Sequence, residues 1–287
     1  MTYSGGMPNA FKKSNNVLKT IGLSILLLIG ALTHVGLYAQ EAYPNKPIRL
    51  VVGFPAGSAT DVAARVVANQ MGQKLGQSFI IENRPGASSD IAARSVATSA
   101  ADGYTLFILT IANIINESSG KSEFVNVQKS FAPIAMIGSV PIILVASAEQ
   151  NINSLKDLTA AAKAKPKAIT FASSGNGTAP HLSGELFAKM ANVDILHIPY
   201  KGSSLAVTDL LAGRVNIMFA PASTALPHIQ SGKLVALGVA SPNPIASAPK
   251  IPTLSDQGLT GFESSVWFGL VAPNGTPPNV VSTLSKA

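Results

Sequence analysis

Two loops rich in glycine and small hydroxyl residues are the segments of this sequence best suited to bind a small anion. Each lies between an apolar run and an amphipathic stretch, as expected where a strand leads into a helix. Free N–H groups and the dipole at a helix start attract anions, and glycine lets the backbone approach a ligand. The first loop offers Phe54, Gly57, Ser58, Ala59, Thr60 and Asp61; the second offers Ser173, Ser174, Gly175, Asn176, Gly177, Thr178 and His181.

Helix capping is the simpler explanation of either loop taken alone. Thr60 and Thr178 are placed as N-caps, and Asp61 in a first helical turn complements the helix dipole. Because the Asp61 carboxylate repels an anion, a ligand role there requires a bridging water or a ligand hydroxyl or amine. His181 fits equally well as a donor to an anion and as a helix-start residue bonded to backbone. Two such loops, one in each half of the chain, favour a two-sided clamp for a carboxylate.

Motifs for catalysis are missing from the sequence. It contains no GxSxG, HExxH or Walker motif, and Gly175-x-Gly177 lacks the third glycine of a dinucleotide loop because Pro180 occupies that position. We expect His197 to be structural within a strand and His228 to lie in a short surface helix. The chain has no cysteine. We therefore expect no enzyme, no catalytic residue, no cofactor and no metal site.

Composition indicates a folded protein of two linked domains. The 287 residues are 47% hydrophobic and only 12% charged, with a net charge of +7. Lys12, Lys13 and Lys19 supply part of that surplus, and the other basic residues are scattered without interleaved aromatic residues. The sequence therefore does not support nucleic-acid binding. We expect a monomer.

The amino terminus has the order of a secretory signal. The three lysines precede an apolar segment, 21–32, and small residues follow, with Ala39 before the expected cut. An uncleaved membrane anchor is the alternative, since no charged residue lies between Lys19 and Glu41. We predict that residues 1–39 are a cleaved signal peptide and that the remainder lies in the periplasm.

These binding loops require a scaffold of alternating strands and helices, and the patterns supply one. Apolar runs predict strands at 48–54, 79–82, 104–110, 134–146, 168–172, 195–200, 215–220, 234–240 and 266–272. Helical spacing and capping signals predict helices near 61–75, 89–100, 154–165, 180–190 and 205–212. This alternation indicates an α/β fold rich in parallel strands. We expect domain 1 at 43–139 plus 241–287 and domain 2 at 140–240, joined by extended crossovers at 134–146 and 234–240.

A series of short motifs along the chain resembles the Bug-type periplasmic receptors of tripartite tricarboxylate transporters. The resemblance covers the sequence from Tyr43 to the end. It is carried by Tyr43-Pro44-x-Lys46-Pro47-Ile48-Arg49, the loop 54–61, Glu82-Asn83-Arg84-Pro85-Gly86-Ala87, Asp102-Gly103-Tyr104-Thr105-Leu106, Phe131-Ala132-Pro133, Ser173-Ser174-Gly175-x-Gly177-Thr178-x-x-His181-Leu182, Pro199-Tyr200-Lys201-Gly202, Ala225-Leu226-Pro227-His228-Ile229 and Trp267-Phe268-Gly269.

That resemblance implies a type II periplasmic-binding-protein fold with a ligand cleft between two α/β domains. It also implies a small mono- or dicarboxylate ligand, held by N–H groups, hydroxyls and waters of the two loops, and delivery to the membrane permease subunits of the transporter. A sensor subunit for a membrane signalling protein is the main alternative, and an exported hydrolase is a remote one.

Two departures from the family pattern affect these expectations. The first loop has Ala56, Ser58 and Ala59 where the family is richer in glycine, which narrows the site or shifts ligand preference. The chain ends at Ala287, whereas family members continue with a segment that packs on the first domain. We therefore expect a truncated domain 1, with consequences for stability and transport.

Overall fold

The fold was determined as a computed structural model that describes residues 1–3, 5, 43–120, 122 and 125–287. The chain divides into two compact units, Met1–Tyr43 and Pro44–Ala287. The basic segment, the apolar segment and the cut site of the predicted signal peptide lie outside the described residues. The helices and strands described in the structure all lie in the second unit.

One group of strands, here called sheet A, forms around β1 (Ile48–Val52). β1 pairs in parallel with β2 (Phe79–Asn83) and β3 (Thr105–Thr110). β9 (Ser265–Pro273) then pairs antiparallel with β3 and with residues 131–141 of β4 (Phe131–Ser147). The β1 run Ile-Arg-Leu-Val-Val is buried at four of its five positions, as a strand covered on both faces requires.

Helices of the sheet A group follow directly on its strands. α2 (Ala59–Leu75) follows β1, α3 (Asp90–Ala97) follows β2 through the short turn η1 (Ala87–Ser89), and α4 (Ile111–Ser118) follows β3. α5 (Val127–Ser130) precedes β4, and α10 (Pro278–Lys286) follows β9. α2 buries Ala64, Ala68 and Met71, which recur at helical spacing.

A second group of strands, here called sheet B, forms around residues 142–147 of β4. These residues pair antiparallel with β7 (Ile217–Pro221) and with β8 (Leu234–Val239). β5 (Thr170–Ser173) pairs in parallel with β6 (Leu196–Pro199) and β7. The helices of this group are α6 (Leu155–Ala164), α7 (Ala179–Ala191), α8 (Ser203–Leu211) and α9 (Ala222–Gln230), with the short turn η2 (Ala148–Gln150) after β4.

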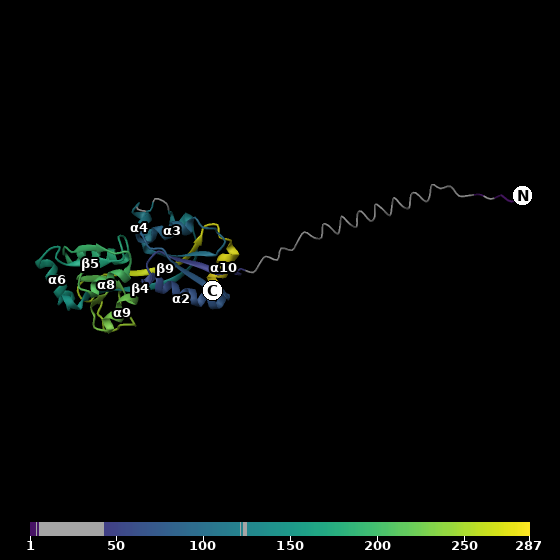
Figure 1. Cartoon of the computed structure of the whole chain (residues 1–287). Helices are drawn as coiled ribbons and strands as arrows, with labels where there is room; N and C mark the ends of the chain where they lie inside the picture. Colours follow the sequence, from purple (N-terminus) through teal and green to yellow (C-terminus); the bar gives the residue numbers. More distant parts are fainter. Residues whose placement is uncertain (4, 6–42, 121, 123–124) are drawn as a thin grey trace. The chain divides into compact units, whose positions relative to one another are not determined.

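β4 belongs to both sheets and connects them (Figure 1). Its pairing with β9 changes register between Pro133 and Ala135 and again between Met136 and Gly138. Such irregularities bend a strand locally. The predicted crossover at 134–146 is thus confirmed as a continuous extended strand.

The chain returns to sheet A at a different place from the one expected. Residues 234–240 were predicted to form the second crossover, but β8 pairs only with the sheet B part of β4. The return is made by residues 240–264 and then by β9. Ile245 and Ile251 of this segment pack in one core cluster with Ile143 and Leu210. Residues up to 251 thus pack with sheet B, which favours a boundary beyond 251 over the predicted one at 240, and the division into two domains stays a prediction.

Candidate functional site

The first predicted binding loop runs from β1 into α2, and its end is buried. Ser58 is the N-cap of α2, where its Oγ accepts a hydrogen bond from the backbone N–H of Asp61 at 3.2 Å. The prediction that Thr60 caps this helix is wrong: Thr60 is its second residue, because the Ser58 hydroxyl already satisfies the free N–H of the first turn. Ser58, Thr60 and Asp61 are each at most 4% exposed, so the start of α2 faces the interior of the protein.

The carboxylate of Asp61 is fully occupied by neighbouring groups. Oδ2 accepts from the backbone N–H of Gly57 at 3.0 Å and from Arg65 Nε at 2.9 Å. Oδ1 accepts from the second nitrogen of the same guanidinium at 3.1 Å and from Asn83 Nδ2 at 3.0 Å. Asn83 Nδ2 also donates to the carbonyl oxygen of Phe54 at 2.9 Å. Asn83 therefore ties both ends of the loop, Phe54 and Asp61, to β2. The ligand role predicted for Asp61 stays a prediction.

Ionisation of Asp61 is favoured by these contacts. Burial alone raises the pKa of Asp61, but the hydrogen bonds from Arg65, Gly57 and Asn83 outweigh that effect and hold the pKa below its ordinary value. The loop is therefore held by a charged group at neutral pH.

The second predicted loop, between β5 and α7, is held by its own side chains. Ser173 Oγ accepts from the N–H of Gly175 at 3.0 Å, and Thr178 Oγ1 donates to the Gly175 carbonyl oxygen at 2.7 Å. The N–H of Gly177 donates to His181 Nδ1 at 3.1 Å. Thr178 occupies the predicted N-cap position, but its hydroxyl bonds back to the loop and forms no cap bond with the helix. The loop therefore has a defined shape without help from a ligand.

Two histidines, His181 and His197, contact residues of this second loop. The rings of His181 and His197 lie 4.2 Å apart between centroids, and His197 also stacks on Phe171 at 4.7 Å. His197 Nε2 lies 2.7 Å from Ser173 Oγ. Burial, and then the neighbouring His181, lower the pKa of His197 to about 4. Ser173 has no exposed surface, so this serine–histidine contact supports the loop and offers no accessible nucleophile.

The two loops meet at a cavity of about 30 Å³. A space of this size holds about two water molecules, or the two oxygens of one carboxylate group. The first loop lines it with Phe54, Ser58, Ala59 and Thr60, and the second loop with Ser174, Thr178, Ala179 and Pro180. None of the lining residues in the described part of the chain carries a charge. Helix starts and hydroxyl groups thus provide the polarity of this inner cavity.

Further lining residues come from segments that were not predicted as part of the site. They are Thr110, Ile111 and Ala112 at the start of α4, Ser203 at the start of α8, Pro221 before α9, and Val266 in β9. All but Val266 stand where a strand or loop leads into a helix. Thr110 and Ser203 carry the same kind of hydroxyl as the predicted loops, which is the signal that could have identified them.

A larger outer hollow of about 410 Å³ adjoins the inner cavity, since Phe54 and Ser174 line both. The predicted residues Gly175 and Asn176 lie here, together with Gly53, Gly86, Ala87, Ser88, Asp90, Asn116, Pro199, Tyr200 and Lys201. Five predicted residues, Gly57, Asp61, Ser173, Gly177 and His181, line neither space. All five take part in hydrogen bonds that shape the loops: Gly57 donates to Asp61, Gly175 donates to Ser173, and Gly177 donates to His181.

The described residues offer neither a metal site nor a membrane-spanning helix. No group of three or more His, Cys, Asp or Glu side chains that could hold a metal ion occurs among them. No helix within the described part is long and apolar enough to cross a membrane.

Fold and cleft together define the class of periplasmic solute-binding proteins. Three solved structures have the same fold: the periplasmic binding protein BugD (34% identity, TM-score 0.81), an R. palustris protein with adipate (35%, 0.79), and MatC from Rhodopseudomonas palustris with bound malate (30%, 0.79). They align over 84–85% of this chain and 81–83% of their own.

Residues 63–287 match the family model described as the tripartite tricarboxylate transporter family receptor. Protein BugT of Bordetella pertussis is 38% identical over 250 residues, which are 86% of this chain and 77% of BugT. The chain belongs to this family of receptors, which bind solutes and are not enzymes. The resemblance noted in the sequence is thereby confirmed.

Proposed function

We propose that this receptor captures a small organic carboxylate between its two loops and delivers it to the membrane permease subunits of a tripartite transporter. The observation that carries the proposal is one uncharged cavity lined by the starts of α2 and α7, which come from different sheets. Helix starts supply N–H groups and positive dipole ends, which favour an anion without a cationic side chain.

The sizes of the two spaces suggest how a carboxylate is placed. The inner cavity has room for one carboxylate group, and the outer hollow has room for the rest of the molecule. Adipate and malate, named with two of the structural relatives, are both dicarboxylates. They are the first ligands to test here.

Delivery to a permease and a periplasmic location rest on the family and on the amino-terminal sequence. The family model is that of a transporter receptor, and BugD is a periplasmic protein. The predicted signal peptide at 1–39 agrees with export.

Thermal unfolding with added ligand tests the proposal directly. The protein is heated alone and with adipate, malate, citrate, acetate or a neutral sugar. A ligand at about 100 times its Kd stabilises by about 2.7 kcal/mol, which raises the Tm of a protein of this size by roughly 5–10 °C. A rise with at least one carboxylate and none with the sugar supports the proposal; no rise with any acid contradicts it.

A matched pair of variants locates the binding site. Ser174 lines both spaces, so Ser174→Leu is expected to weaken binding at least tenfold while the protein stays folded. Ser282→Leu places the same side chain at an exposed position of α10, away from the cavity, and should leave binding unchanged. Equal affinity in the two variants would remove the second loop from the site.

A further inference from the structure

A hydrogen bond joins the two walls of the outer hollow. Ser88, in the η1 turn between β2 and α3, donates from its Oγ to the carbonyl oxygen of Asn176 at 2.7 Å. Ser88 belongs to the sheet A group, and Asn176 belongs to the binding loop after β5 of sheet B. Because a hydrogen bond requires close approach, this one exists only while the two walls are together.

Backbone geometry at Ser88 is unusual. Ala87, Ser88 and Ser89 have φ values of 45°, 49° and 80°, in the left-handed region that residues with a Cβ rarely adopt. Such a conformation persists only where the surroundings impose it. Asn116 Nδ2 does so by donating to the carbonyl oxygens of Ala87 at 3.1 Å and Ser88 at 3.3 Å. The turn therefore presents the Ser88 hydroxyl in one fixed direction.

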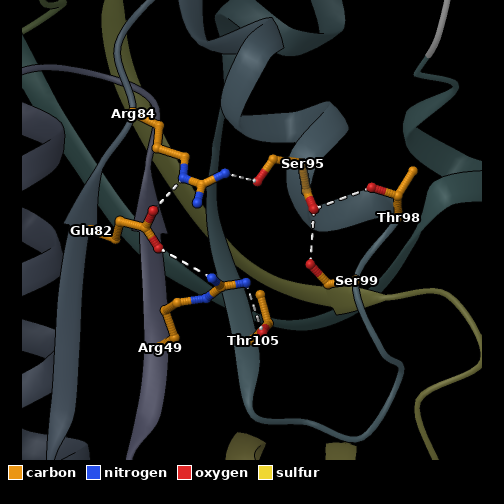
Figure 2. Close-up of polar contacts among 7 residues, drawn as sticks. All are labelled: Arg49, Glu82, Arg84, Ser95, Thr98, Ser99 and Thr105. Carbon is orange, nitrogen blue, oxygen red and sulfur yellow. Dashed lines mark hydrogen bonds and ion pairs between the residues drawn. The ribbon is translucent and has the colours of Figure 1, made fainter.

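Arg84 links the strand before this turn to the helix after it, through the contacts with Glu82 and Ser95 that Figure 2 shows. Its guanidinium pairs with Glu82 of β2 and donates to Ser95 Oγ of α3 at 2.9 Å. Glu82 also pairs with Arg49 of β1 at 3.4 Å. The strand before the turn and the helix after it are thus linked, which restricts the movement of the turn that carries Ser88.

Opposite Ser88, the binding loop approaches closely enough to be positioned by the bond. A Cβ placed on Gly175 would lie 3.0 Å from Ser88 Oγ and 3.2 Å from the carbonyl oxygen of Tyr200. Gly175 precedes Asn176 and follows Ser174, which lines the inner cavity. The bond from Ser88 to the Asn176 carbonyl therefore also fixes the position of the loop beside the inner cavity, where the carboxylate is proposed to bind.

We propose that Ser88 is a positioning residue that keeps the cleft closed through its bond to Asn176 and so slows the release of ligand. The role of Ser88 in ligand release rests on the proposed function, whereas its effect on closure does not. Affinity scales with the fraction of protein in the closed state. Loss of one neutral hydrogen bond lowers the ratio of closed to open protein by about 2- to 10-fold.

Closure can be measured without any ligand. The chain has no cysteine, so Gln73→Cys on α2 and Lys156→Cys on α6 give two exposed spin-label positions, one in each group. In the Ser88→Ala variant we expect the label-to-label distance distribution to shift toward longer distances. Ser118→Ala is the matched control, since its hydroxyl donates to the carbonyl oxygen of Ile114 within α4. A Ser88→Ala distribution that superimposes on the parent overturns the proposal.

A second variant and a rate measurement separate the effect of losing the hydroxyl from the effect of backbone strain. Ser88→Gly removes the hydroxyl and also relieves the left-handed backbone strain. The label-to-label distances of the two variants should therefore agree, while the unfolding midpoint of Ser88→Gly should be higher than that of Ser88→Ala. With adipate and malate as probes, both variants should dissociate about 2- to 10-fold faster, with little change in association rate. Unchanged dissociation where the parent binds overturns the proposal. A parent that binds neither acid counts against the proposed function instead, and the distance measurement still decides the role of Ser88.

Discussion

The side chain of Asp61 lines neither space of the proposed site, yet its hydrogen bonds shape the loop that does. It is a carboxylate at the start of a helix that faces an expected anion, which is an unfavourable place for direct contact. The structure occupies both of its oxygens with Gly57, Arg65 and Asn83. Its negative charge is thereby balanced by Arg65, and the loop that it holds carries the N–H groups and hydroxyls expected to bind a ligand.

Asp61→Asn should therefore reduce stability and affinity together. The amide turns one of the two acceptor oxygens into a donor and weakens the bonds from Arg65, Gly57 and Asn83 together, so we expect a loss of roughly 1–3 kcal/mol in the free energy of unfolding. The loosened loop should also bind adipate or malate more weakly. Urea unfolding and titration at pH 7 measure the two effects. Asp157→Asn, in the exposed first turn of α6, is the control and should change neither.

An affinity loss without any stability loss would contradict this interpretation, because it would indicate that the Asp61 carboxylate contacts the ligand. Arg65→Ala provides a second check. Since the Arg65 side chain is 54% exposed, its removal should cost less than about 1 kcal/mol, provided Asn83 and Gly57 keep the carboxylate in place.

His197 should make the stability of the protein depend on pH. Its pKa is about 4 in the folded protein and near 6.5 when unfolded, so the unfolded chain binds more protons between these values. Stability is therefore full above pH 6.5 and falls as the pH drops toward 4, by at most about 3 kcal/mol. Asp61 acts in a lower range, because its lowered pKa makes its contribution disappear only below its ordinary value of 3.8.

Urea unfolding between pH 4 and 7.5 measures this dependence, with His197→Gln as the variant that cannot titrate. We expect the variant to have a shallower slope between pH 6.5 and 4, whatever its stability at pH 7. Parallel slopes in the two proteins would show that the proton is taken up elsewhere.

Strands and helices could be predicted where the signal is local. The buried run of β1 and the apolar stripe of α2 are visible in the sequence, and both elements lie within two residues of their expected starts. α4 was missed, because Ile111–Ser118 follows β3 without a glycine or proline to mark the boundary. Its capping box, Thr110 with Asn113, is a weak signal beside the apolar residues that precede it.

The packing of one element against another could not be predicted from the sequence patterns. The Leu-Val-Ala-Leu-Gly-Val run of β8 predicts a strand correctly, but it contains nothing that specifies pairing within sheet B. The same limit applies to the site. The two glycine-containing loops were identified from local composition, whereas Ser203, Pro221 and Val266 reach the inner cavity only through tertiary packing.

α7 depends on a glycine for its position on sheet B. Gly184 faces Phe171 of β5, and a Cβ there would lie 2.1 Å from the phenyl ring, which is 1% exposed. Gly184→Ala should therefore destabilise the protein by about 1–3 kcal/mol despite the better helix propensity of alanine.

Thermal or urea unfolding measures the loss, and a second substitution tests its cause. Phe171→Leu in the Gly184→Ala background should restore part of the stability, because it frees the space that the new methyl group needs. A double variant that shows only the sum of two losses would contradict the steric explanation.

Two loops from opposite groups approach each other at Gly202 and Pro55. Gly202 precedes α8 in the sheet B group, and a Cβ placed on it would lie 2.5 Å from Pro55 Cδ in the first predicted binding loop. Its φ of 163° is extended, so alanine can adopt that backbone without strain. The added methyl group therefore clashes with Pro55 when the two groups come together, and not with its own backbone.

Gly202→Ala should therefore weaken the binding of adipate or malate at least tenfold and leave the unfolding of the ligand-free protein nearly unchanged. Because the rigid proline ring cannot move aside as a flexible side chain can, the two groups must stay apart by about the width of a methyl group. Spin labels at Gln73→Cys and Lys156→Cys would then report a longer distance, as for Ser88→Ala but through repulsion in place of a lost bond. Pro55→Ala combined with Gly202→Ala should recover closure and affinity. A Gly202→Ala protein that binds as tightly as the parent would mean that this contact is absent from the ligand-bound state.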